Sequence, residues 1–167
     1  MRNFYWIFFL FFLSCNASQK EKCQFGTPAP IFNSEMASVT QHSFQAKDQE
    51  GSEQMEFDNE LKVEIDQSGC NHIKQVFKFW IDRPGEGEPN WYFLAAEQFA
   101  YLSNISNETK MLGMWAEVIE TNASQFKLGM PVEVDQGFFV KIDKINEDQK
   151  VILFVELSQN LYPSNSN

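Results

Sequence analysis

The sequence predicts an α+β fold, in which a mostly antiparallel sheet carries two consecutive helices packed on one face. Residues 36–81 and 129–157 are rich in the period-two alternation of apolar and polar residues that is typical of strands. Residues 90–122, between them, carry apolar residues at helical spacing. Strands followed by helices and then by strands again indicate an α+β domain, here with roughly five to seven strands.

The first strand is predicted over residues 36–46 and is followed by a polar turn over residues 47–53. Residues 54–66 have the clearest alternation in the chain. A three-residue loop at 58–60 would pair Glu56 with Lys62 and Met55 with Val63, so that each pair matches in character. A two-residue loop or one unbroken strand are the alternatives.

The later strands are predicted over residues 73–81, 138–145 and 151–157, the last two forming a hairpin. Residues 129–134 form either a short strand or an extended segment leading into the hairpin. The segment 83–89 has two prolines and two glycines, which indicates a break in regular structure. Residues 151–157 are apolar on both faces, which is typical of a central strand.

Two helices are predicted over residues 90–103 and 106–122, with Asn90 and Ser106 as their N-terminal caps. The first helix has an apolar face that includes Leu94 and Phe99, and the second has one that includes Leu112. A glycine inside the second helix is expected to weaken it by about 1 kcal/mol relative to alanine.

The N-terminal residues have the pattern of a secretory signal. Arg2 supplies the only charge, residues 4–13 are almost entirely apolar, and Phe12-Leu13-Ser14-Cys15 follows. The apolar run is shorter than the roughly twenty residues that span a bilayer. The Phe12–Cys15 tetrapeptide resembles the lipobox of bacterial lipoproteins, although Phe12, Leu13 and Ser14 stand where other residues are commoner. An ordinary signal peptide that is cut after Ala17 is the alternative.

The lipobox resemblance implies that Cys15 becomes the lipidated first residue of a protein in the bacterial cell envelope. The body would then be held to the membrane by lipid, facing the periplasm or the cell exterior. Under this interpretation residues 1–14 are the signal peptide and residues 15–35 are the lipidated cysteine with a tether. Residues 36–158 form a single α+β domain, and residues 159–167 form a flexible tail.

The formal net charge of −10 restricts the class of partner. Nucleic acids bind to patches of lysine and arginine, so this composition argues against a nucleic-acid-binding protein. An acidic surface attracts cationic partners, and it also keeps a protein soluble. We therefore expect a protein or a small ligand as the partner, with a cationic one favoured.

Two further cysteines, Cys23 and Cys70, form an even pair if Cys15 carries lipid. In an oxidising compartment such a pair is expected to form a disulfide. The bridge would close a long loop and contribute roughly 4 kcal/mol by the chain-entropy account. Two free thiols are the alternative.

The segment Ser68-Gly69-Cys70-Asn71-His72 is the most distinctive polar segment of the chain. One interpretation makes Ser68, Gly69, Asn71 and His72 a binding turn, with His72 acting as a binding residue or a general base. The other interpretation is an ordinary surface turn. The sequence has no phosphate-binding loop, no Gly-x-Ser-x-Gly motif, no His-Glu-x-x-His motif and no Cys-x-x-Cys pair.

Aromatic side chains offer a second candidate site. Trp80 and Tyr92 lie at positions that the apolar patterns do not assign clearly to the core, so they are the candidates for an aromatic pocket. Packing in the core is the alternative. The acidic residues between 56 and 66 alternate along a strand and spread apart at about 3.3 Å per residue, which argues against a calcium site. We predict no metal site and no cofactor.

Three functions are compatible with these observations. The first is a lipid-anchored cell-envelope protein with a non-enzymatic binding or structural role. The second is an inhibitor of a secreted enzyme such as lysozyme, because Ser68-Gly69 resembles the Ser-Gly loop of bacterial lipoprotein lysozyme inhibitors, although the Arg-Tyr that follows in that family is missing. The third is an envelope hydrolase that uses His72 or paired acids.

Overall fold

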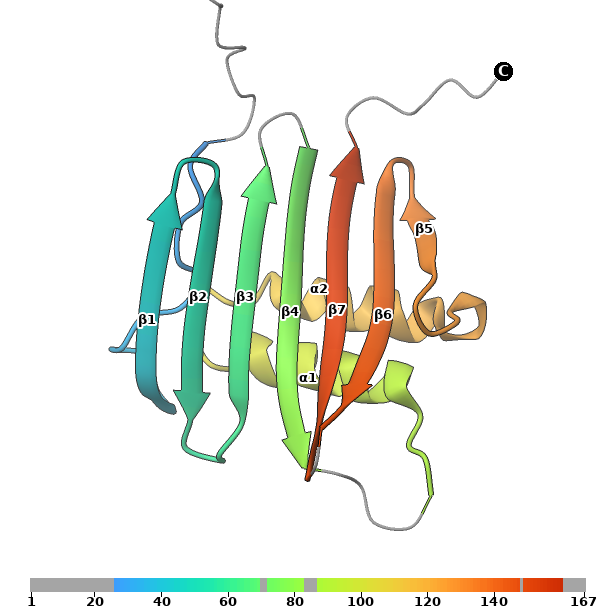
Figure 1. Cartoon of the computed structure of the whole chain (residues 1–167), viewed down its shortest axis with the longest axis horizontal. Coiled ribbons are helices and arrows are strands. Elements are labelled where there is room, and N and C mark those ends of the chain that lie inside the picture. The colour runs from blue at the N-terminus through green and yellow to red at the C-terminus, as the bar shows by residue number, and fades with distance from the viewer. Residues whose placement is uncertain (1–25, 70–71, 83–86, 148, 161–167) are drawn as a thin grey trace, which may run out of the picture.

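A computed structural model describes residues 26–69, 72–82, 87–147 and 149–160 of the chain (Figure 1). Seven antiparallel strands form one sheet, and two helices run across one of its faces, behind the sheet in Figure 1. The predicted α+β fold, with a mostly antiparallel sheet, is confirmed.

The elements follow one another in a simple order. The first four strands are β1 (Val39–Lys47), β2 (Glu50–Phe57), β3 (Lys62–Gly69) and β4 (His72–Asp82). The helices are α1 (Trp91–Ser103), α2 (Leu112–Thr121) and the short 3-10 helix η1 (Ala123–Gln125). The last strands are β5 (Pro131–Asp135), β6 (Phe138–Asn146) and β7 (Lys150–Asn160). The strand order β1-β2-β3-β4-β7-β6-β5 makes β7 an interior strand, as its apolar pattern predicts.

The hairpin between β2 and β3 has the predicted three-residue loop. Glu56 pairs with Lys62 and Met55 pairs with Val63. The Phe57 amide donates to the Leu61 carbonyl at 2.9 Å, and Glu60 closes the loop with a φ of 64°. A residue in the left-handed region is typical of such loops, so side-chain matching and turn geometry select the same register.

The turn between β1 and β2 is shorter than predicted. The predicted polar turn over residues 47–53 is wrong in extent, because Lys47 already pairs with Glu50 and only Asp48 and Gln49 lie between the strands. The first strand also begins at Val39 rather than at residue 36. Polar residues after Glu50 continue the strand because Gly51 and Glu53 turn inward and are buried there.

The first helix has the predicted cap, and the second does not. The Asn90 side chain accepts hydrogen bonds from the amides of Tyr92 and Phe93. Ser106 is not the cap of α2, which begins at Leu112. Ser106 instead forms a separate turn with Thr109, whose buried hydroxyl donates to the Ser106 carbonyl at 3.1 Å.

Gly113 has a packing role between the two helices. A Cβ atom at this position would lie 3.3 Å from the Ser103 hydroxyl of α1. The glycine that lowers the intrinsic helix stability therefore permits the close approach of α2 to α1.

The core lies between the helices and the face of the sheet that they cover, which we call the inner face. Phe99 of α1 contacts both Phe77 and Phe79 of β4, with ring centroids 4.8 and 5.8 Å apart. Phe32 is also buried, so the core begins before the predicted domain start at residue 36. β7 likewise continues to Asn160, beyond the predicted domain end at residue 158.

The other face, which we call the outer face, is turned toward the viewer in Figure 1. The helices and the segment before β1 lie behind the sheet, so no second layer covers the outer face in the described part of the chain. The outer face is therefore open to solvent over all seven strands.

Candidate functional site

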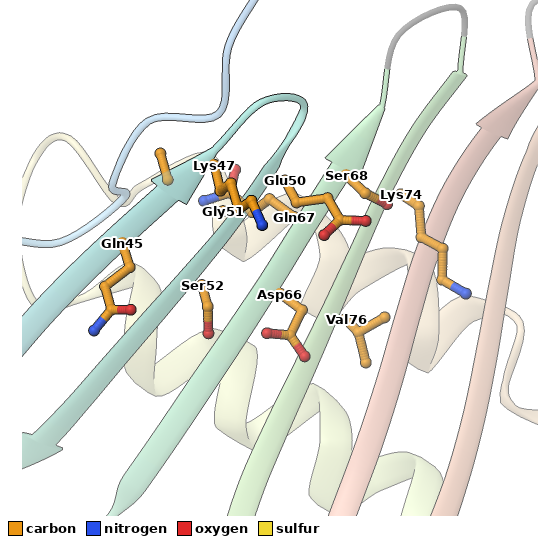
Figure 2. A pocket seen from close by; sticks show the side chains of 11 residues that line it. Gln45, Lys47, Glu50, Gly51, Ser52, Asp66, Gln67, Ser68, Lys74 and Val76 are labelled. Atoms are coloured by element: carbon orange, nitrogen blue, oxygen red, sulfur yellow. The ribbon is translucent and has the colours of Figure 1, made fainter.

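A hollow of about 460 Å³ lies on the outer face over β1 to β4 (Figure 2). Two rows of side chains cross these four strands there. The strand register gives the rows as Lys47, Glu50, Ser68, Lys74 and Gln45, Ser52, Asp66, Val76. Since adjacent strands lie about 4.8 Å apart, each row extends over roughly 14 Å.

The lining of the hollow mixes polar and apolar groups, with its acids on the two middle strands and its lysines on the two outer ones. Glu50 and Asp66 stand on β2 and β3, each opposite a serine on the neighbouring strand. Lys47 lies on β1 and Lys74 on β4, at the two ends of one row. A ligand in the hollow would therefore meet hydrogen-bond acceptors at the centre and the Lys47 side chain at one end.

Ion pairs hold part of this surface in place. Lys78 of β4 contacts Asp66 at 2.7 Å and also pairs with Glu64. Burial opposes the charge of Lys78, but the hydrogen bonds to Asp66 and Glu64 outweigh it and raise the pKa of Lys78. On the other side, Lys74 pairs with Glu156 of β7 at 2.9 Å. The contact with Lys78 holds Asp66 at the hollow, whereas the pair with Glu156 draws the Lys74 ammonium toward β7 (Figure 2).

Part of the predicted binding turn lies at this hollow. Ser68 lines it, and Gly69 ends β3 beside it. A Cβ at Gly69 would lie 2.1 Å from the His72 carbonyl oxygen, so only glycine fits this turn. His72 is exposed at the start of β4 and is not among the lining residues, while Asn71 lies outside the described residues.

The three cysteines lie outside the described residues. Neither the predicted lipidation of Cys15 nor the predicted disulfide between Cys23 and Cys70 has a described position in the structure. Both stay predictions that rest on the sequence.

The two candidate pocket aromatics lie on different sides of the sheet. Trp80 is on the outer face of β4, where the Lys62 ammonium lies 5.4 Å from its ring centroid. Tyr92 is on α1 behind the sheet, with its ring centroid 5.7 Å from that of Phe126. The structure therefore does not bring them together in one pocket.

Glu53 is a buried charged residue that the sequence analysis did not identify. Its side chain is fully buried on the inner face, where its two oxygens accept hydrogen bonds from the amides of Ile31 and Phe32, each at 2.8 Å. The His42 Nε2 atom lies 2.8 Å from Glu53 Oε1. Extending the alternation of β2 back from Met55 would have placed Glu53 on the apolar face and marked it as unusual.

Glu53 has a structural role rather than a place in the hollow. Its carboxylate joins residues 31 and 32 to β2 by two hydrogen bonds, and the His42 ring is a third polar partner of the same carboxylate. A buried carboxylate needs such partners because an unpaired buried charge is very costly. His42 is thereby used inside the fold and points away from the outer face.

Two further observations concern ligand classes. Within the described residues, no group of three or more histidine, cysteine, aspartate or glutamate side chains is arranged to hold a metal ion. None of the helices described is long and apolar enough to cross a membrane.

Comparison of the chain with protein-family models, with curated proteins and with solved structures finds no match.

Proposed function

We propose that the chain is a lipid-anchored protein of the bacterial cell envelope with a non-enzymatic binding role, and that the outer-face hollow is its binding site. The observation that carries the binding role is the hollow itself, an uncovered concavity of about 460 Å³ with polar and apolar groups in its lining. Ligand sites are concave and contain a few polar groups that fix orientation.

The chemistry of the hollow favours a polar ligand that donates hydrogen bonds at its centre. Glu50 and Asp66 are acceptors, and Ser52 and Ser68 add hydroxyl groups that donate or accept. A positively charged group would pair with the Glu50 carboxylate, beside the Asp66 carboxylate that Lys78 already holds, in keeping with the acidic composition of the chain.

The binding role is tested by filling the hollow. Ser52→Trp places a large ring in it, whereas Ser43→Trp changes the neighbouring outer-face position of β1, outside the hollow. Each full-length protein is immobilised and exposed to envelope extract, and the retained molecules are identified by mass spectrometry. We expect at least one species to be retained by the wild type and by Ser43→Trp but lost with Ser52→Trp. Identical retention by all three proteins would contradict the proposal.

The lipid anchor is tested separately by metabolic labelling with a radioactive fatty acid. We expect label in the wild-type protein and none in Cys15→Ala. Label that persists in the variant, or a wild type that takes up none, would contradict the lipid anchor at Cys15. The test of the binding role would not be affected.

A second candidate is inhibition of lysozyme. One observation favours it: Ser68, from the segment that resembles the inhibitor loop, lines the hollow. Lysis of bacterial cells by lysozyme is measured with and without the protein at low salt. We expect slower lysis if the candidate is right, with the effect lost in Ser68→Trp. An unchanged lysis rate excludes this candidate for that enzyme.

A further inference from the structure

The outer face carries an apolar patch on the half of the sheet away from β1 and β2. Trp80 of β4, Ile152 of β7 and Ile145 of β6 are direct neighbours in one row across three adjacent strands. Phe154 of β7 lies one position along on the same face, between Lys78 and Asp143. We call Trp80, Ile145, Ile152 and Phe154 the apolar patch.

The patch is separate from the core. Ile152 is only 7% exposed, yet it does not belong to the core cluster, because its cover comes from its neighbours on the outer face. Ile145 is 52% exposed. Strands that are apolar on both faces normally have a layer on each side, and in the described residues β7 has a layer on the inner side only.

The charges around the patch are of both signs. Four lysines and five acids border it: Lys62, Lys78, Lys141 and Lys150 with Glu64, Asp82, Asp143, Glu147 and Glu156. Several already form pairs, such as Lys150 with Asp82 at 3.7 Å. The chain as a whole has a net charge of −10, so this rim differs from the average surface.

The mixed charges of the rim favour one kind of partner. A strongly cationic or anionic partner would meet like charges as well as opposite ones. A second copy of the chain, related by a two-fold axis, presents the same mixture of both signs, so each lysine can face an acid. The helices are less suited to this contact, because α1 and α2 expose Glu97, Glu117 and Glu120, which would repel their counterparts.

We propose that this face is a homodimer interface, in which two copies pack sheet against sheet through the apolar patch. Face-to-face packing of two sheets buries alternate side chains of both, as in a β-sandwich. A small hollow of about 150 Å³ lies beside Ile145 and Phe154 and gives a side chain of the second copy a place to enter. The inference goes beyond the proposed binding role, which concerns the hollow over β1 to β4.

Photocross-linking in the cells that make the protein tests this interface on the full chain. A benzoylphenylalanine is introduced at position 145, and at position 114 as a matched control, since Met114 is 61% exposed on α2. We expect a product of twice the chain mass from position 145 and none from position 114. A product with a different protein at position 145, or no product there, would overturn the proposal.

The strength of the contact is then measured with the purified full chain in detergent by sedimentation equilibrium. Ile145→Asp places one carboxylate from each copy in the apolar interface. We expect this change to raise the dimer dissociation constant by about thirty-fold or more. Met114→Asp should leave the constant unchanged. A wild type that is monomeric at every concentration, or an Ile145→Asp protein that associates as well as the wild type, would also overturn the proposal.

Discussion

The two faces of the same strands follow different rules. On the inner face, β4 contributes Phe77 and Phe79, and both are fully buried against α1. On the outer face, the alternate residues of β4 have three different surroundings. Val76 lines the hollow, Lys78 forms ion pairs, and Trp80 belongs to the apolar patch. The inner face is mostly apolar because the helices and the segment before β1 cover it, whereas the outer face varies because no layer covers it in the described part of the chain.

The largest expected difference between the faces is on β4 itself. Phe77→Ala should lower the free energy of unfolding by about 3–5 kcal/mol, because it leaves a cavity in the core. Val76→Ala, one residue away on the outer face, should cost less than about 1 kcal/mol. Urea denaturation of both variants measures the two values. Equal losses would show that the outer face is as tightly packed as the inner one.

Glu53 is the exception on the inner face, and an isosteric change tests it. Glu53→Gln should cost about 2–3 kcal/mol, because the amide nitrogen cannot accept a hydrogen bond and leaves a buried backbone donor at Ile31 or Phe32 unpaired. Glu56→Gln, on the outer face of the same strand, should change stability by no more than about 0.5 kcal/mol. Urea denaturation compares them. An unchanged free energy of unfolding in Glu53→Gln would mean that the hydrogen bonds from residues 31 and 32 to this side chain do not stabilise the fold.

The ion pairs of the outer face should show in alkaline solution. The pKa of Lys78 is raised above its ordinary value of about 10.5, so the folded state holds this proton more tightly than the unfolded state does. Its contribution, on the order of 1 kcal/mol, is complete below the unfolded pKa and is lost as the pH rises through the folded pKa. The melting temperatures of the wild type and Lys78→Met should therefore converge at high pH. The difference in melting temperature between the wild type and Lys110→Met should not change with pH.

The smallest effect is expected at the exposed pair between Glu88 and Lys144. The hydrogen bond from Lys144 lowers the pKa of the Glu88 carboxyl. Its stabilisation is present above the ordinary glutamate pKa and is lost as the pH falls through the lowered folded value. An NMR titration of the Glu88 side chain checks the direction, and Lys144→Met should return the pKa toward its ordinary value. A titration unaffected by this change would contradict the pairing.

Where local signals agreed, the fold was predictable. The hairpin between β2 and β3 was predicted with its register because both the loop length and the pairing of Glu56 with Lys62 favoured the same solution. Asn90 was identified as a cap because its side chain satisfies orphan amides at a helix start. α2 was predicted to start too early, since the Ser106 hydroxyl has the chemistry of a cap but accepts from the Glu108 amide in a separate turn ahead of the helix.

The hollow was predictable only in part. Ser68 was singled out from its own segment, but the residues beside it in the rows come from other strands, and the strand register brings them together. Glu50 and Ser52 were assigned to a turn because a polar stretch does not reveal which way its side chains face. A site assembled across four strands is thus set by tertiary pairing rather than by any local motif.

Glu53 also has a mechanical consequence. Residues 28–32 run across the inner face. There the Gln67 side chain donates to the Ala29 carbonyl, and Glu53 accepts from the amides of residues 31 and 32. The Phe32 side chain is buried in the core. Tension applied to the chain ahead of Pro28 therefore reaches β2 and β3 before it can act on the edge strand β1. A domain pulled from that end would resist by the shearing of several contacts together, not by the unzipping of its outermost strand.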